Sequence, residues 1–365
     1  MLAYVMLLLL PLIVFAFIVL VIHRGIYVYS LKEERILLGV FFAIFFLLLC
    51  LRGKSVGVDL ENYLHRYYQI SRIDLAGVFE KQVPVDIGYG LLNKLFAVLG
   101  VSDRVFIILI AILTVFPLAW LYITETDNWM LTVSLFIILP IFSICFTGLR
   151  QSLAIAAVPL QFYFTKKKNI IGFLLAVLLA YLFHSTAIFT LILYPVYHIR
   201  IKKTWLLGLI PLMAAIYIFN RQLYSLTVRL LGGKFEERYG EIGNTGAYEM
   251  LLLFVLFAVV SFVLTDENLM DDDDFGLRNL LLLTVVFQFF APVNSIAMRL
   301  NYYFLVFIPI AVPRMLVLHK VRYRKFALAA QSVMVVAFSG YFLYKAYRGG
   351  DSMHVFKYVP FWRDS

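Results

Sequence analysis

Residues 2–22 read LAYVMLLLLPLIVFAFIVLVI and contain no charged side chain. As a helix, a run of about 20 apolar residues is long enough to cross the hydrocarbon core of a bilayer. The run lacks the basic flank and the small-residue cleavage site that are typical of a signal peptide. We therefore expect a retained membrane helix at this position.

The rest of the chain has the same character. Of its 365 residues, 63% are hydrophobic and only 15% are charged, and the mean hydropathy is +0.90. Soluble domains are about half apolar and a quarter charged, so a globular core cannot hide this much apolar surface. This excludes a soluble enzyme, a disordered chain and a nucleic-acid-binding protein. We predict an all-α polytopic membrane protein, with residues 1–365 forming a single integral membrane domain.

Apolar stretches bounded by charged residues predict about 12 transmembrane helices. The stretch 87–100 is short for a crossing and predicts a re-entrant or interfacial helix. The stretches 170–183 and 186–199 are also short, and they form either a hairpin that turns at His184 or one long broken helix. The predicted spans are residues 2–22, 36–51, 105–124, 129–146, 149–165, 170–183, 186–199, 205–219, 249–264, 278–292, 299–318 and 326–345.

Basic loops predict the orientation in the membrane. The formal charge is +10, with 32 Lys and Arg against 22 Asp and Glu. The positive-inside rule assigns loops rich in Lys and Arg to the cytoplasm. With the N-terminus outside, the basic loops all fall on that side, at residues 23–35, 166–168, 200–203 and 319–325.

The other loops follow from this orientation. The acidic loop 265–274 falls on the cytoplasmic side, where we expect a solvated turn. The extracytoplasmic face receives the long loops 52–86 and 220–248, the C-terminal tail and several polar helix ends. The two cysteines, Cys50 and Cys145, lie in apolar runs without disulfide or zinc spacing, and we expect buried apolar side chains.

Three arginines stand at helix ends on the predicted extracytoplasmic face. Arg150 and Arg299 each open an apolar helix, where a guanidinium opposes the helix dipole. A nearby anion would explain both positions, because the helix N-terminus and the arginine would both attract it. Tyr302 shares a helix face with Arg299. Arg52 follows an apolar run directly, and its alternative role is to snorkel to the interface.

Two acids and a histidine accompany these arginines. Asp59 lies four residues before Tyr63, on the same face of a helix that starts near Asp59. Asp86 precedes the stretch 87–100 in the sequence Val-Asp-Ile-Gly-Tyr-Gly. Each acid is either a helix cap or a functional carboxylate. His184 lies between two apolar stretches and is either a packing group or a proton-transfer group.

The order and spacing of these residues resemble the EpsG family. One departure is Asp86, where the family pattern leads us to expect Glu. The resemblance covers most of the chain. Its motifs are Arg52…Gly57-x-Asp59…Tyr63, an acid before Gly88-Tyr89, Leu149-Arg150-Gln151-Ser152-Leu153-Ala154, Phe183-His184-Ser185 and Arg299-x-x-x-Tyr303.

The resemblance implies a Wzy-like polymerase of bacterial exopolysaccharide or O-antigen, with a GT-C-like fold in the inner (plasma) membrane and an extracytoplasmic active face. The donor would be a growing glycan on polyprenyl (undecaprenyl) diphosphate. The terminal sugar hydroxyl of a lipid-linked repeat unit would attack its anomeric carbon with inversion. The implied partners are polyprenyl-diphosphate-linked oligosaccharides, membrane lipid and a chain-length-regulating co-polymerase, and not nucleic acid.

This chemistry suits the residues described above. A leaving diphosphate needs positive charge and hydrogen-bond donors, and an attacking hydroxyl needs a proton acceptor. No metal-ligand spacing, Walker loop or Gly-x-Ser-x-Gly is present, so we expect neither a metal nor a cofactor. The expected diphosphate-binding residues are Arg52, Arg150, Gln151, Arg299 and Tyr302. The candidate proton acceptors are Asp59, Asp86 and His184, and the expected sugar-binding residues are Tyr63, Asn301 and Tyr303.

Two alternatives remain open. An O-antigen ligase would use similar arginines, but ligases usually have one large outer loop. A transporter or flippase of an anionic lipid-linked saccharide usually contains inverted repeats and broken helices. The sequence has no visible repeat, although the interruption within residues 170–199 is compatible with a broken helix.

Overall fold

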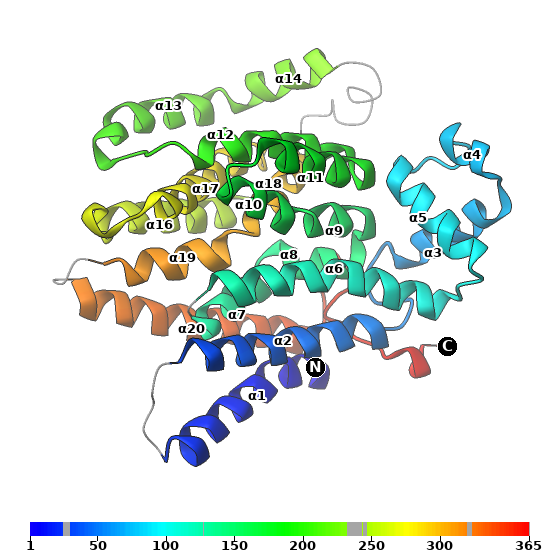
Figure 1. Cartoon of the computed structure of the whole chain (residues 1–365), viewed down its shortest axis with the longest axis horizontal. Helices are drawn as coiled ribbons and strands as arrows, with labels where there is room; N and C mark the ends of the chain where they lie inside the picture. The colour runs from blue at the N-terminus through cyan, green and yellow to red at the C-terminus, as the bar shows by residue number, and fades with distance from the viewer. Residues whose placement is uncertain (25–29, 127, 232–242, 244–246, 320–322, 365) are drawn as a thin grey trace. The chain divides into compact units, whose positions relative to one another are not determined.

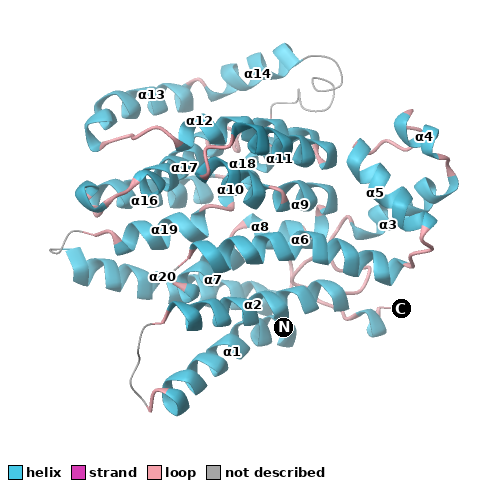
Figure 2. Cartoon of the chain, viewed as in Figure 1, coloured by secondary structure: helices cyan, strands magenta, loops and turns pink. Residues whose placement is uncertain are grey.

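The computed structural model describes residues 1–24, 30–126, 128–231, 243, 247–319 and 323–364. These residues form helices joined by loops, and they contain no β-strand (Figure 2). The all-α prediction is confirmed. The chain divides into two compact units, which we call unit 1 (residues 1–188 and 332–365) and unit 2 (residues 189–331). The single integral membrane domain stays a prediction.

Several helices are suited to a membrane. Among the described residues, 4 helices are long and apolar enough to cross it, and the number rises to 7 if each bent helix pair is one span. This supports a polytopic membrane protein, with fewer long spans than the sequence predicted. The four long spans are Leu2–Ile22 (α1 with the π-helical turn that follows it), α2 (Leu31–Leu51), α6 (Asp103–Glu125) and α20 (Arg324–Arg348).

Prolines account for much of the difference. The predicted span 129–146 is bent by 58° between α7 (Trp129–Ile138) and α8 (Pro140–Thr147). The predicted span 299–318 is bent by 51° between α18 (Ser295–Leu305) and α19 (Ile308–Val317). Pro140 is the first residue of α8 and Pro309 is the second residue of α19, and at these positions a proline cannot donate a backbone hydrogen bond and its ring crowds the preceding residues.

Unit 1 is built around α2, which packs against α6 and α1 (Figure 1). Phenylalanines from α2, α7 and α8 fill the space between these helices; the Phe45 ring lies 5.3 Å from that of Phe136 and 5.2 Å from that of Phe142. Both cysteines are buried and unpaired, as expected. The other helices of unit 1 are α3 (Leu60–Arg72), α4 (Leu75–Phe79), α5 (Ile87–Val98), α9 (Leu149–Ala156), α10 (Val158–Lys166) and α11 (Ile170–Phe183).

The loops of unit 1 lie at two ends of its helices, and each end has its own polar contacts. At one end, Lys166 forms an ion pair with Glu125 at 2.8 Å, and the Trp129 amide donates to Glu34 at 2.6 Å. At the other end, Lys54 forms an ion pair with Asp103 at 2.6 Å. Because α6 runs from Asp103 to Glu125, the two ends are separated by the length of a membrane-spanning helix, about 35 Å. We call them the basic end and the polar end.

The C-terminal tail is fastened to the polar end. The Gly53 amide donates to Val359 O at 2.8 Å, and the Gly57 amide donates to His354 O at 3.1 Å. Ser55 Oγ donates to Asp364 at 2.6 Å. These bonds order the loop before α3, which the sequence placed on the same face as the tail.

Unit 2 is centred on α17 (Asp272–Gln288), which contacts five other helices of the described part of the chain. Residues 232–242 and 244–246 of the predicted loop 220–248 lie outside the described residues. The other helices of this unit are α12 (Leu193–Tyr197), α13 (Leu206–Ile218), α14 (Asn220–Leu231) and α16 (Tyr248–Val263), together with α18 and α19.

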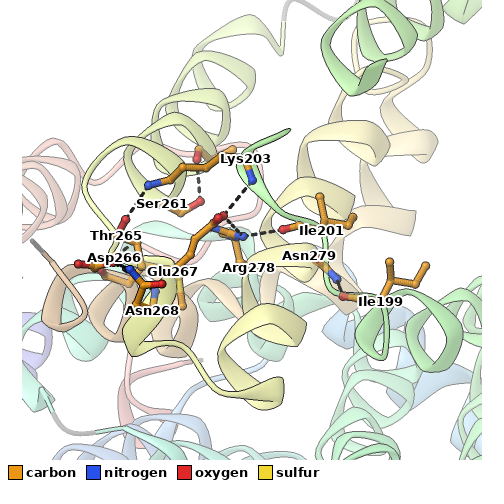
Figure 3. Close-up of polar contacts among 12 residues, drawn as sticks. Ile199, Ile201, Lys203, Ser261, Thr265, Asp266, Glu267, Asn268, Arg278 and Asn279 are labelled. Carbon is orange, nitrogen blue, oxygen red and sulfur yellow. Dashed lines mark hydrogen bonds and ion pairs between the residues drawn. The ribbon is translucent and has the colours of Figure 1, made fainter. Parts of the chain in front are cut away.

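The acidic loop of unit 2 is only partly the solvated turn that the sequence suggested, because Asp271 and Asp272 are exposed while Glu267 pairs with an arginine. Figure 3 shows it joined to the basic loop 200–203: Glu267 accepts from Arg278 Nη2 at 2.7 Å and from the Lys203 amide at 2.9 Å. Arg278 is fully buried, 4.1 Å above the ring of Phe262. A buried guanidinium needs a nearby carboxylate, so the acidic loop serves as the counter-charge within this unit.

Candidate active site

Asp86 and Arg150 form an ion pair at the polar end of unit 1. Arg150 Nη1 donates to Asp86 Oδ2 at 2.9 Å, with 15% and 19% of the two side chains exposed. Asp86 stands at the N-cap position of α5, yet its carboxylate accepts no hydrogen bond from that helix. Capping therefore does not explain this acid. The anion expected beside Arg150 is supplied in this structure by the protein itself.

His184 joins this pair. Its Nδ1 lies 3.7 Å from Asp86 Oδ2, which is too long for a hydrogen bond but close enough for strong electrostatic interaction. The backbone is extended at His184, where α11 ends. Close packing of α5 on α11 holds the two groups together, because a Cβ at Gly88 would lie 2.8 Å from Leu182. Gly88, the first glycine of the Gly-Tyr-Gly motif, thus permits the close packing of α5 on α11.

The environment favours the ionised form of Asp86. Burial alone raises the pKa of this carboxyl, but His184 and the guanidinium of Arg150 lower it by more. The net result is a pKa below the usual Asp value. At neutral pH the site therefore holds a carboxylate that is shared by an arginine and a histidine.

Polar atoms without partners occur on Arg150 and His184, which contact Asp86, and on Tyr89 and Asn93 of the same helix, α5. Arg150 Nε, His184 Nδ1, Tyr89 Oη and Asn93 Oδ1 are all buried and have no hydrogen-bond partner among the described residues. Tyr89 and Asn93 lie one turn apart on α5, and Tyr89 is within electrostatic range of Arg150. Buried polar groups are normally paired in folded proteins. Four such atoms in one region indicate a site that a polar ligand would complete.

The sequence did not single out Tyr89 and Asn93 as site residues. The available signal was a tyrosine between two glycines, followed by an asparagine one helical turn later. Tyr63, which was predicted, does belong to this region: its ring packs edge-on against that of Tyr89 at 5.7 Å. Helix α3 therefore contributes to the site together with α5 and α9.

Asp59 and Arg52 lie beside the break between α8 and α9. The Thr147 hydroxyl donates to Asp59 Oδ2 at 3.3 Å. Arg52 is 2% exposed, and its Nη1 donates to Phe146 O at 2.5 Å. In this structure Arg52 therefore satisfies a carbonyl at the C-terminal end of α8. The roles of Asp59 in proton transfer and of Arg52 in diphosphate binding stay predictions.

The remaining predicted residues lie on α9 and on α18. Gln151 is buried in α9, directly after Arg150. Arg299 is exposed on α18 of unit 2, and Tyr302 and Tyr303 are buried on the same helix. Asn301 Nδ2 donates to Thr284 O and to Gln288 Oε1, both at 3.0 Å, which ties α18 to α17.

No group of three or more His, Cys, Asp or Glu side chains is arranged to hold a metal ion among the residues that the structure describes. The positive charge next to Asp86 is the guanidinium of Arg150. A guanidinium binds phosphate oxygens through paired N–H donors. The geometry is therefore suited to an oxyanion next to a carboxylate–imidazole pair.

Taken together, these features define an all-α membrane protein with an arginine–carboxylate–histidine site at one end of a helical unit. The EpsG family model matches residues 35–359, and the chain belongs to this family of Wzy-like exopolysaccharide polymerases. The resemblance seen in the sequence is thereby confirmed. Membership indicates a polysaccharide-polymerase-like function in a bacterial membrane, with lipid-linked saccharides as substrates. Comparisons with curated proteins and with solved structures found no match.

Proposed function

We propose that this protein is a glycosyltransferase that polymerises lipid-linked oligosaccharides. It transfers a growing glycan from polyprenyl diphosphate to the terminal sugar hydroxyl of a lipid-linked repeat unit. The observation that carries the proposal is the cluster around Asp86. There, Arg150 has an unused buried donor, and a histidine lies 3.7 Å from the same carboxylate.

The reaction is a single displacement. The acceptor hydroxyl oxygen attacks the anomeric carbon of the donor sugar and forms the new glycosidic bond. The bond between that carbon and the phosphate oxygen breaks, and its electron pair leaves with polyprenyl diphosphate. The hydroxyl proton passes to a base on the protein. Attack opposite the leaving group inverts the anomeric configuration.

His184 is the favoured base in this scheme. A neutral imidazole nitrogen can accept the hydroxyl proton, which suits the role of a general base. Asp86, whose pKa is lowered, is a weak base but a good partner for the imidazolium that forms. We therefore assign Asp86 to orient and stabilise His184, and Tyr89 to donate a hydrogen bond to substrate.

Arg150 stabilises the leaving diphosphate. Its Nη1 is engaged by Asp86, while its Nε remains available. Charge that develops on the departing phosphate strengthens this interaction in the transition state. The proposal requires no metal ion, and chelator-treated protein should retain its activity. The further diphosphate-binding residues of the proposal are Arg52, Gln151, Arg299 and Tyr302, and the further sugar-binding residues are Tyr63, Asn301 and Tyr303.

The proposal includes a cellular setting. It places about 12 spans in a GT-C-like arrangement, in the inner membrane, with the polar end extracytoplasmic. There the carrier lipid can present repeat units of exopolysaccharide or O-antigen, and a chain-length-regulating co-polymerase can engage the enzyme. These assignments rest on family membership and on the distribution of basic loops.

The decisive experiment is turnover by purified protein on a polyprenyl-diphosphate-linked repeat unit, followed by gel analysis of the products. Wild-type protein should produce a ladder. Arg150→Ala and Arg299→Ala should each reduce chain extension by about 100-fold or more, the scale of losing one transition-state donor. Arg72→Ala is the matched control, because this exposed arginine ends α3 at the same end of unit 1.

Three outcomes would contradict the proposal. Wild-type ladders from both Arg150→Ala and Arg299→Ala would show that neither arginine binds the diphosphate. Uptake of the lipid-linked saccharide into vesicles without new glycosidic bonds would show a transporter. Transfer of finished glycan to a lipid core without laddering would show a ligase.

A further inference from the structure

A groove lies at the basic end of unit 1, away from the candidate active site. It has a volume of about 310 Å³ and runs between the last turns of α6 and the length of α10. Leu121, Pro159 and Phe162 form apolar parts of its lining, and Thr124 and Lys167 add polar groups. The groove thus combines an apolar surface with a polar, positively charged one.

The position of the groove matches the membrane interface. Helix α6 is a candidate span of 23 residues, and the groove is confined to its C-terminal turns. Trp120 and Tyr163 border it with rings 6.0 Å apart, and 43% of each residue is exposed. Half-exposed Trp and Tyr are typical of the headgroup level of a bilayer.

The charges of the groove favour an anion. Glu125 lines it, but this carboxylate is neutralised by Lys166 at 2.8 Å. Lys167 is exposed and also lines the groove. Lys168 is exposed as well and adds positive charge next to the groove without lining it. The balance is positive, so a negatively charged headgroup is attracted.

We propose that this groove binds the headgroup of an anionic phospholipid. The phosphate lies near Lys167, and the first carbons of the acyl chains lie over Leu121 and Phe162. The occupant we propose is a lipid and not a free anion, because much of the lining is apolar. A free phosphate would gain no binding free energy from that apolar surface, whereas acyl chains would. The proposal is independent of the polymerase reaction.

Native mass spectrometry on the full chain tests it, with phosphatidylglycerol and phosphatidylcholine as probes. Wild-type protein should retain phosphatidylglycerol in preference to phosphatidylcholine. Lys167→Glu should weaken phosphatidylglycerol binding about 30-fold, since the reversal changes the charge by two units and each unit near the surface contributes on the order of 1 kcal/mol. Lys168→Glu is the matched control, with the same charge change at an exposed residue that does not line the groove, and it should weaken phosphatidylglycerol binding clearly less than Lys167→Glu does.

A second variant separates shape from charge. Thr124→Trp fills the groove and keeps every lysine, so it should also lose bound phosphatidylglycerol. Equal retention of the two lipids, or unchanged affinity in both Lys167→Glu and Thr124→Trp, would overturn the proposal. Displacement of the lipid by millimolar inorganic phosphate would identify a site for free phosphate and would overturn it as well.

Discussion

At the scale of single residues, Arg150 shows how a charge at a helix start is accommodated. The sequence argument required an anion, and the structure supplies Asp86 at 2.9 Å. This pairing gives the arginine two functions. It holds Asp86 next to His184, and it keeps an unused Nε for a ligand. A substrate phosphate would join an existing charge network and would not have to create one.

The first residue-scale prediction concerns Tyr89. Tyr89→Phe removes a buried hydroxyl that has no partner in the protein, so the free energy of unfolding should stay the same or rise slightly. Chain extension should fall about tenfold, which corresponds to one hydrogen bond to substrate. Thermal unfolding and ladder assays measure the two effects.

Tyr67→Phe is the matched control for Tyr89→Phe. The Tyr67 hydroxyl donates to Val101 O at 2.6 Å. Its removal should lower stability by about 1 kcal/mol and leave chain extension nearly unchanged. If Tyr89→Phe showed this same pattern, its hydroxyl would have no role in the reaction.

The second residue-scale prediction concerns pH. Because the pKa of Asp86 is lowered in the folded state, its stabilising contribution is complete above the unfolded-state pKa, about 3.9. The contribution is lost as the pH falls through the folded-state value. Asp86→Asn should therefore have a lower Tm at pH 7 and a flatter decline in Tm below about pH 4. If the Tm of the wild type and the Tm of Asp86→Asn declined in parallel below about pH 4, Asp86 would not have this role.

At the scale of elements, short segments around the broken helices build the polar end. The loop before α3 packs against the junction of α8 and α9, and the C-terminal tail fastens it from outside. Gly57 has φ +96°, and a Cβ there would lie 2.2 Å from Phe146 O. Only glycine fits both the backbone conformation and the contact.

Gly57→Ala should therefore destabilise the protein by about 1–3 kcal/mol and reduce chain extension, because the loop that carries Asp59 must move. Thermal unfolding and the ladder assay test this. Gly39→Ala on α2 is the control: nothing lies within 4 Å of an added Cβ there, and a helical alanine should stabilise by up to about 1 kcal/mol. Equal effects from both changes would contradict the contact.

At the scale of the whole molecule, the two main features are the apolar helices that are suited to a membrane and the distribution of charged side chains within each unit. Unit 1 separates a basic end from a polar end that carries the Asp86 site. Unit 2 contains its own ion pairs, Arg278 with Glu267 and Arg200 of the basic loop with Asp272. In the proposed orientation the polar end faces the outside of the membrane, which is the side where we propose that polymerisation takes place.

Cysteine labelling in intact cells tests this orientation. Ser55 and Lys167 are exposed at opposite ends of unit 1. A membrane-impermeant thiol reagent should label Ser55→Cys directly and Lys167→Cys only after permeabilisation. The natural cysteines are buried and should give little background. Labelling of Lys167→Cys from outside would reverse the assignment.

Several features were predictable from the sequence because they depend on local composition. Apolar runs such as residues 2–22 predict membrane helices whatever their neighbours are. Short motifs in a fixed order were sufficient to identify the EpsG family. Proline bends were less predictable, because a proline can end a helix, kink it or begin the next one.

The sequence by itself determined an all-α membrane protein, the family and the residue types of the site, since hydropathy and motif order are properties of the linear chain. Only the tertiary structure decided the partners: Asp86 with Arg150, 64 residues apart, and Arg52 with Phe146 O, 94 residues apart. It also showed the unsatisfied hydroxyl of Tyr89. The physical reason is that the role of a buried polar atom depends on which groups are packed against it. Packing brings together residues that are distant in the sequence, so it depends on the whole chain.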